Sequence, residues 1–120
     1  MIPLGIVASG VGVSDGSIND HFNRADGAIG TTDTGQAWTV HVGTWSVVSN
    51  AAGMTTGSNG FASVDWGVTD MKVSAKIVSN SYPGLTAHYV DTSNYYMLEV
   101  DNLNNGLYLG RWIGGARWWL

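Results

Sequence analysis

Short segments in which apolar and polar side chains alternate recur along this chain, and clusters of Gly, Asn, Asp and Ser separate them. Such alternation is typical of strands in an antiparallel sheet, whereas the longer period of an amphipathic helix is nearly absent. The clearest alternation lies at residues 71–78, where a slip of one position would bury Lys72 and Lys76. The pattern therefore predicts both a strand and the face of that strand which meets the core.

Turn residues separate several further segments that fit strands. These predicted strands are residues 38–42, 45–48, 85–90, 95–100 and 107–113. The Asn-Gly pair at residues 105–106 is a strong tight-turn signal, and residues 114–116 predict a turn before a short final strand. Residues 50–60 are small and polar, so we expect a loop there. Six to eight strands without intervening helices indicate a sandwich or a barrel. Of these we expect an all-β, antiparallel sandwich of the jelly-roll type.

The length of 120 residues fits a single domain. We expect residues 1–19 to form an extended N-terminal arm and residues 20–120 to form the sandwich. Ile2, Leu4 and Ile6 give this arm an apolar side that docks on a neighbouring molecule. A frayed end or a first edge strand fits the same residues equally well.

Aromatic side chains are concentrated at the C-terminal end of the sequence. Trp118, Trp119 and Leu120 follow the last predicted turn, and Trp112 precedes it. Left bare, these residues would form an exposed apolar patch and an edge open to strand pairing. Either they form an assembly interface with another subunit, or the natural chain continues beyond Leu120 and completes the sandwich. The sequence leaves both interpretations open.

Composition and charge argue against several classes of partner. Charged residues make up 12% of the chain, the formal net charge is −4, and the five Lys and Arg residues do not form a stripe. Nucleic acid is therefore not expected, because phosphates need clustered cations. No apolar run is long enough to span a membrane, so we expect no membrane partner. The absence of Cys excludes disulfide bonds and thiolate metal sites.

Several short segments carry a resemblance to a known family. DHFNRADG at residues 20–27, GTTDTGQAW at residues 30–38 and GTW at residues 43–45 resemble the opening of concanavalin A-like lectin/glucanase (laminin-G-like) sandwiches. They are most similar to the version in minor tail proteins of phages that infect actinobacteria. DTSNYY at residues 91–96 and MIPLGIVAS at residues 1–9 are also similar to such proteins. The family's sandwiches are usually longer than this chain.

The resemblance implies a non-enzymatic structural protein of a phage virion. It would be a minor tail protein or a decoration protein on the capsid surface, acting by protein–protein association and by adhesion to the host surface. Its partners would be other virion proteins and further copies of itself in a homo-oligomer. The alternative function is a carbohydrate-binding module that recognises cell-envelope glycans.

Four aromatic residues are candidate glycan contacts, because a sugar ring stacks on Trp or Tyr while its hydroxyl groups bond Asn, Asp and Ser. These residues are Tyr82, Tyr95, Trp112 and Trp118. Core packing or a subunit interface is the other interpretation of the same four side chains.

The motif at residues 20–38 also has a structural interpretation. Phe22 and Trp38 are large apolar residues that flank a loop, and Arg24 has two possible partners, Asp20 and Asp26. Asp followed by Gly is ordinary turn chemistry. We interpret these five residues as a structural latch, with a ligand site as the alternative.

Catalysis is not expected. Family members that hydrolyse β-glucans carry the motif Glu-x-Asp-x-x-Glu, and the matching positions here are Glu99, Asp101 and Asn104. Asn104 cannot donate the proton that the leaving group needs. No Cys nucleophile and no Gly-x-Ser-x-Gly elbow is present either.

No cofactor or metal is predicted. His21, His41 and His88 are far apart in the sequence and fit surface or hydrogen-bonded roles. Residues 101–112 lack the oxygen ligands of an EF-hand loop. A calcium site built from distant loops, such as Asp26 with Asp33, is left open.

Overall fold

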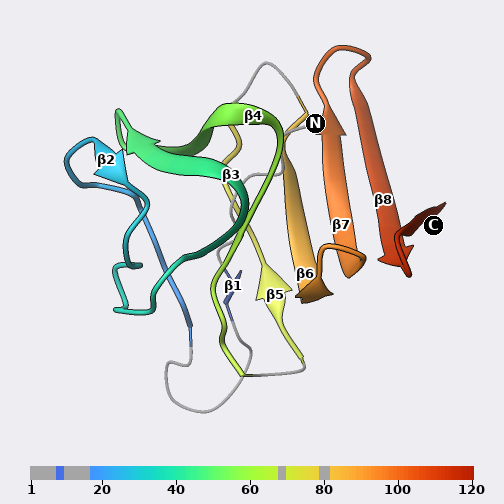
Figure 1. The fold of residues 1–120 in the computed structure, drawn as a ribbon, viewed down its shortest axis with the longest axis horizontal. Helices are drawn as coiled ribbons and strands as arrows, with labels where there is room; N and C mark the ends of the chain where they lie inside the picture. The colour runs from blue at the N-terminus through green and yellow to red at the C-terminus, as the bar shows by residue number, and fades with distance from the viewer. Residues whose placement is uncertain (1–7, 10–16, 68–69, 79–81) are drawn as a thin grey trace.

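The chain folds as an all-β sandwich in the computed structural model (Figure 1). The structure describes residues 8–9, 17–67, 70–78 and 82–120, and these contain nine strands, more than the six to eight predicted. The strands are β1 (Ala8–Ser9), β2 (Gly27–Ala28), β3 (Thr39–Val48), β4 (Ala51–Ser63), β5 (Lys72–Val73), β6 (Gly84–Asp91), β7 (Asn94–Asp101), β8 (Gly106–Ile113) and β9 (Ala116–Trp119). The described part of the chain has no helix that could cross a membrane.

Two antiparallel sheets pack together and form the sandwich. One has the strand order β2-β3-β4, the other has the order β6-β7-β8-β9, and β1 pairs separately with β5. Figure 1 shows the four-stranded sheet, in orange to red, beside the curved green pair of β3 and β4. The prediction of an antiparallel all-β sandwich is confirmed. The jelly-roll connectivity stays a prediction.

The four-stranded sheet follows the sequence prediction closely. β7 and β8 pair in an unbroken register from Tyr95 opposite Trp112 to Asp101 opposite Gly106. Gly114 and Gly115, with φ values of 59° and 80°, form the two-residue turn into β9. Left-handed backbone at both turn positions matches the twist of the flanking strands and favours Gly. The predicted turn and short final strand are therefore confirmed, except that Ala116 belongs to β9 and not to the turn.

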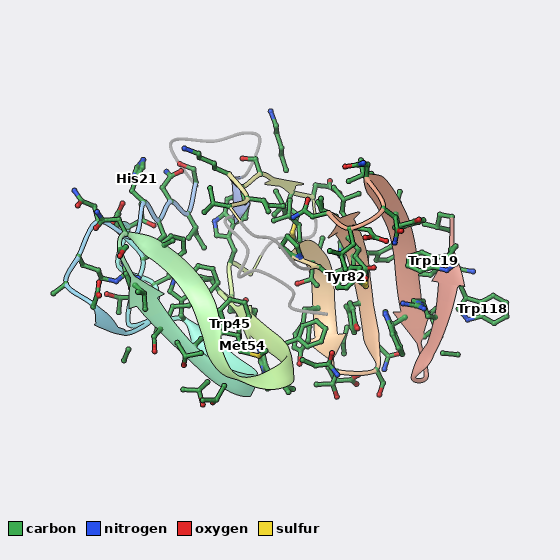
Figure 2. All side chains as sticks on the ribbon, turned by 90° about the horizontal axis from the view of Figure 1, so that it is seen from above. His21, Trp45, Met54, Tyr82, Trp118 and Trp119 are labelled. Carbon is green, nitrogen blue, oxygen red and sulfur yellow. The ribbon has the colours of Figure 1, made fainter. Side chains whose placement is uncertain are left out.

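The loop predicted for residues 50–60 is wrong, because β4 runs through it from Ala51 to Ser63. Small residues are needed there for close packing rather than for a turn. A Cβ atom on Gly60 would clash with Met54 Sδ and would lie 2.9 Å from Trp45 Nε1. Figure 2 shows Trp45 and Met54 together on this pair of strands. The glycine-rich, polar composition hid a strand whose period was interrupted.

The strand predicted at residues 71–78 is also largely wrong. Within the part of the chain that the structure describes, only Lys72–Val73 of this segment pairs with another strand, and its partner is Ala8–Ser9. Exposure nevertheless alternates along the whole segment, with Met71, Val73, Ala75 and Ile77 less exposed than their neighbours. Alternation thus identified which side chains of this segment face the protein interior. It does not show whether the backbone of the segment has a neighbouring strand to form hydrogen bonds with.

The two segments predicted at residues 38–42 and 45–48 belong mostly to one strand, β3. Its pairing with β4 shifts register between Val40 and Trp45, where Gly43 has a φ of 80°. Such bulges bend a strand and change which side chains face inward. The core of this sheet consists of Ile29, Trp38, Trp45, Ala52 and Ala62, with Phe22, Met54 and Val64 packed against it.

The predicted arm is described only in part. Ile2, Leu4 and Ile6 lie outside the described residues. Within the predicted range of residues 1–19, Ala8–Ser9 pairs with β5 of the same chain, and Ile18 is fully buried.

Candidate functional site

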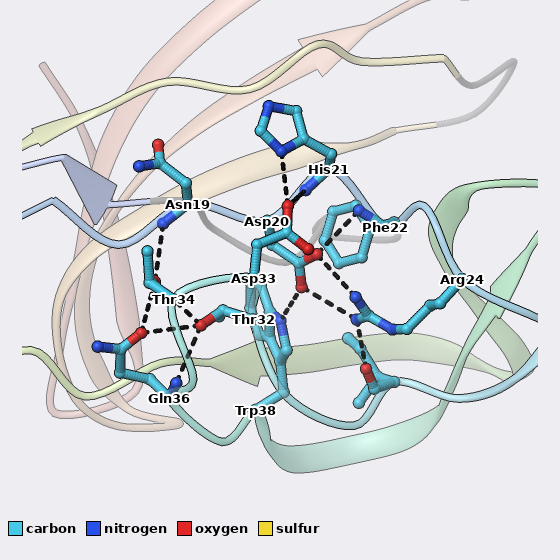
Figure 3. Close-up of polar contacts among 11 residues, drawn as sticks. Asn19, Asp20, His21, Phe22, Arg24, Thr32, Asp33, Thr34, Gln36 and Trp38 are labelled. Carbon is cyan, nitrogen blue, oxygen red and sulfur yellow. Dashed lines mark hydrogen bonds and ion pairs between the residues drawn. The ribbon is translucent and has the colours of Figure 1, made fainter.

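One buried carboxylate holds the loop that precedes β3 (Figure 3). Asp20 Oδ1 accepts hydrogen bonds from the backbone N–H of Phe22 and from Arg24 Nη1, both at 2.8 Å. Asp20 Oδ2 accepts from Arg24 Nη2 at 3.0 Å and from the indole Nε1 of Trp38 at 2.7 Å. The Asp20 side chain is fully buried. The guanidinium therefore compensates a charge whose burial would otherwise be costly.

Arg24 links this carboxylate to the aromatic residues of the latch. Its Cζ lies 5.3 Å from the centroid of the Phe22 ring, which in turn lies 5.9 Å from the Trp38 ring. The hydrogen bond to Asp20 raises the pKa of Arg24 above its usual value. The sequence leaves Asp20 and Asp26 open as partners of Arg24. In the structure Arg24 binds Asp20.

Asp26 lies outside this network and supports a different turn. Its Oδ1 accepts a hydrogen bond from the backbone N–H of Ser49 at 2.9 Å. Ser49 and Asn50, with φ values of 51° and 59°, connect β3 to β4. Both therefore adopt the left-handed backbone of a tight hairpin turn. The structure thus separates Asp26 from the other four predicted latch residues.

Asp33 is bonded to His21. Asp33 Oδ2 accepts a hydrogen bond from the His21 backbone N–H at 2.9 Å and lies 2.6 Å from His21 Nδ1. These two bonds lower the pKa of Asp33 below its usual range. Across the described ranges, no three His, Cys, Asp or Glu side chains gather closely enough to hold a metal ion. Both carboxylates considered for calcium, Asp26 and Asp33, thus already accept hydrogen bonds from the protein.

A row of aromatic rings joins the two sheets. The His41 ring of β3 lies 4.4 Å from Tyr89 of β6, and the Phe61 ring of β4 lies 4.8 Å from Tyr95 of β7. Tyr95 stacks at 5.9 Å on Trp112 of β8. Burial lowers the pKa of His41, and it raises the pKa of Tyr95 to about 12. These rings form the hydrophobic contact between the sheets.

The row continues to the edge of the four-stranded sheet as an aromatic platform, defined as Tyr108, Trp112, Arg117 and Trp119. The Arg117 guanidinium lies 4.4 Å from the centroid of Trp119 and 6.0 Å from that of Trp112. Tyr108 lies 5.4 Å from Trp119. Gly110 leaves room for the Trp119 ring, because a Cβ atom there would approach the ring to 2.9 Å. Cation–π contacts thus order the partly exposed rings.

Glu99 lies on the same side of the sheet as this platform. It pairs with Tyr108 across the β7–β8 ladder, and it is 93% buried, since its exposed fraction is 7%. Its Oε2 has no hydrogen-bond partner in the described structure. Desolvation raises the pKa of Glu99, although the positive charge of Arg117 lowers it in part.

The structure separates the four candidate glycan contacts. Tyr95 and Trp112 line one hollow of about 660 Å³ together with His88, Tyr96 and Arg111. Tyr82 lies just before β6 and is half-buried, and Trp118 projects outward from β9 (Figure 2). Two of the four residues are therefore near each other, and the other two do not line this hollow.

The side of the four-stranded sheet that faces away from Tyr95 is apolar. We call this side the outer face. Register and alternation place on it Leu85, Tyr96, Leu98, Val100, Leu107, Leu109, Ile113 and Trp118, with Arg111 as its charged member. Leu107 is 66% exposed and Trp118 is 57% exposed. On β7 the buried side carries Tyr95, Met97, Glu99 and Asp101, so both acidic residues of this strand lie inside.

The residues that match the glucanase motif hold a turn. Asp101 Oδ1 accepts hydrogen bonds from the backbone N–H groups of Leu103 and Asn104, and Asp101 Oδ2 accepts one from the Asn104 side-chain amide at 2.8 Å. These bonds lower the pKa of Asp101. The contacts of Asp101 and Asn104 are those of a loop between β7 and β8.

A scan against protein-family models and searches of curated proteins and of solved structures each found no match to this chain. The resemblance to concanavalin A-like sandwiches is therefore a proposal.

Sequence reasoning missed several residues of the platform and of the outer face. Tyr108 and Arg117 lie in alternating segments, and the β8–β9 register brings Arg117 opposite Trp112 and Trp119 beside Tyr108. Alternation along residues 107–113 puts Leu107 and Leu109 on one face of the strand, but nothing in the pattern tells which face is buried. The signal that identifies the inner face is the pairing of Phe61 with Tyr95, which only the fold reveals.

Proposed function

We propose that this protein is a non-enzymatic structural component of a phage virion, located in the tail or on the capsid surface, and that it acts by protein–protein association. The outer face of the four-stranded sheet is the observation that carries the proposal. Monomeric proteins seldom expose a contiguous apolar patch of large side chains, and such patches usually mark interaction sites. The family resemblance supplies the virion as the setting.

The energetics of the outer face support association. Each fully covered Leu would contribute about 2 kcal/mol of transfer free energy, and part of that gain offsets the cost of ordering the partners. Repetition of the same contact around a symmetric particle would strengthen a weak single contact. Arg111 is the charged residue among these apolar side chains and would order the approach of an acidic partner group.

The proposal is tested on phage particles purified from the source of this chain. An antibody against the chain should label the particles, and a photo-crosslinking amino acid at Leu107 should join the chain to a virion protein. The matched control places the same group at Thr92, in the exposed turn between β6 and β7. Particles with complete heads and tails but without this chain would overturn the proposal.

A second candidate function, a carbohydrate-binding module for cell-envelope glycans, is favoured by the aromatic platform. Trp119 is 48% exposed and sits over Gly110 beside Tyr108, which gives a sugar ring an apolar surface to stack on. Arg117 supplies hydrogen-bond donors for sugar hydroxyl groups.

Two adjacent tryptophans distinguish the two functions, because Trp118 and Trp119 point to opposite sides of β9 (Figure 2). Glycan binding, measured by calorimetry with cell-wall polysaccharide fragments, should be lost in Trp119→Ala and retained in Trp118→Ala. Association through the outer face should show the reverse sensitivity. Equal glycan affinity in both variants and the parent would exclude the platform as a sugar site.

A further inference from the structure

The two edges of the four-stranded sheet are not alike. β6 forms one edge and β9 the other. The pairing of β6 is irregular between Ala87 and Asp91, and His88 in this stretch has a φ of 48°. A bulge of this kind twists an edge away from a new strand, and Pro83 directly before β6 also lacks a donor. β9 has neither device, and all of its residues are exposed.

The ladder between β8 and β9 shows which backbone groups of β9 are already used. Leu120 N–H donates to the carbonyl of Leu109 at 2.9 Å. Because hydrogen-bonded and non-hydrogen-bonded pairs alternate in an antiparallel ladder, Trp118 is also bonded inward, to Arg111. The N–H and C=O groups of Arg117 and Trp119 therefore point outward from the sheet, where β9 has no strand neighbour in the described residues.

We propose that β9 is the interface for a second copy of this chain, which adds its own β9 in antiparallel orientation and joins two sheets into one across a two-fold axis. This inference rests on the proposed function and gives the association one named partner. The two-fold axis lies between Trp118 of one copy and Trp118 of the other. Arg117 of each copy is therefore opposite Trp119 of the other copy.

This register satisfies the backbone. Arg117 and Trp119 are the residues whose backbone groups point outward, and here each pair of them exchanges both N–H···O=C bonds. Trp118 then faces its own symmetry copy in a non-hydrogen-bonded pair, where side chains approach most closely. A two-fold interface must be self-complementary in this way.

Charge favours the same register. Within one chain the Arg117 guanidinium already lies over the Trp119 ring at 4.4 Å. The proposed pairing repeats that cation–π contact between copies. A register centred on Arg117 would place two guanidinium groups directly opposite each other, which is unfavourable. A register centred on Trp119 would leave the outward groups of Arg117 without a partner strand.

The hairpin is held in position before any partner arrives. The backbone N–H of Gly114 donates to Asn94 Oδ1 at 3.0 Å, and that of Gly115 donates to the carbonyl of Ser93 at 3.1 Å. These bonds tie the β8–β9 turn to the start of β7. An edge that is already ordered loses less conformational entropy when it pairs.

Light scattering of the purified chain gives the first test. The parent should have about twice the mass of the 12.7 kDa chain. Arg117→Pro removes an outward N–H without removing a β8–β9 bond, so it should be monomeric with the circular dichroism of the parent. A parent that is monomeric at about 100 µM would overturn the inference, because even a weak dimer should form at that protein concentration. A proline variant that remains dimeric would overturn it as well.

Single cysteines test the register even where the proline variant fails to fold, because the natural chain has none. Trp118→Cys should form an intermolecular disulfide readily, since its Cα would lie roughly 4.5 Å from its symmetry copy. Ala116→Cys is the matched control, with its copy displaced by roughly 13 Å along the strand. Equal crosslinking of the two variants would overturn the proposed register.

These measurements separate the inference from the proposed function. A monomeric chain that still labels phage particles removes the β9 pairing and leaves virion association. A β9 dimer that is absent from particles supports the pairing and removes the virion function.

Discussion

The carboxylate of Asp20 accepts a hydrogen bond from the indole Nε1 of Trp38 at 2.7 Å and so joins two residues that are 18 positions apart. The same buried carboxylate binds Arg24 through both oxygens. Asp20→Ala would leave the indole N–H and the guanidinium without their acceptor. We expect it to lower the free energy of unfolding by about 3 kcal/mol, measured by urea denaturation followed by tryptophan fluorescence.

Asp26→Ala is the matched control for that loss. Asp26 accepts one hydrogen bond, from the backbone N–H of Ser49 in an exposed turn. Its removal should cost about 1 kcal/mol or less, because water can replace the lost acceptor. Equal losses in the two variants would show that burial of the Asp20 carboxylate is not what stabilises the loop.

Tyr95 should make the sandwich sensitive to alkaline pH. Burial raises the pKa of its phenol to about 12, above the unfolded value of 10. The stability that the neutral phenol contributes is fully present below pH 10 and is lost as the pH rises through 12. Urea midpoints at pH 8, 10 and 11 should therefore fall in the parent and change less in Tyr95→Phe. A parallel fall in both proteins would assign the alkaline sensitivity to other groups.

The sequence predicted the four-stranded sheet better than its neighbour, for a physical reason. β7 and β8, and likewise β8 and β9, form local hairpins whose registers are set by short turns such as Gly114-Gly115. β3 and β4 instead depend on bulges, and on Gly60 packing against Met54 and Trp45. Bulges interrupt the alternation of apolar and polar residues along these strands, so the sequence pattern predicts a loop where β4 lies.

The latch was predictable in chemistry but not in pairing. Arg24 lies within a few residues of both Asp20 and Asp26, and only the path of the chain past Trp38 distinguishes them. The aromatic row was less predictable, because Phe61 and Tyr95 meet through sheet packing rather than through sequence spacing. Local patterns thus identified faces, whereas contacts between sheets needed the fold.

Glu99 should make the folded chain less stable at neutral pH than at mildly acidic pH. Desolvation raises the pKa of this buried carboxyl above its unfolded value of 4.5. The stability contributed by the neutral form is complete below pH 4.5 and is lost as the pH rises through the raised pKa. At pH 7 the free energy of unfolding of Glu99→Gln, measured by urea denaturation, should therefore exceed that of the parent by about 1 kcal/mol. The difference should shrink towards pH 4.5.

The contrary result for Glu99 would also be informative. Arg117 attracts the ionised carboxylate and opposes the desolvation. If Glu99→Gln were less stable than the parent at pH 7, the attraction of Arg117 would exceed the cost of burial, and the inner side of β7 would hold an ion pair that favours folding.

Two glycines in strands should respond oppositely to alanine. A Cβ atom on Gly84 would lie 2.8 Å from the carbonyl oxygen of Leu98, a backbone atom of the neighbouring strand that cannot move alone. Gly84→Ala should therefore cost about 2 kcal/mol of unfolding free energy. For Gly53 in β4, no atom of the described residues lies within 4 Å of such a Cβ, so Gly53→Ala should gain about 0.5 kcal/mol by restricting the unfolded chain. Chemical denaturation of both variants measures the difference, and an unchanged Gly84→Ala would mean that β6 can shift away from β7 without loss.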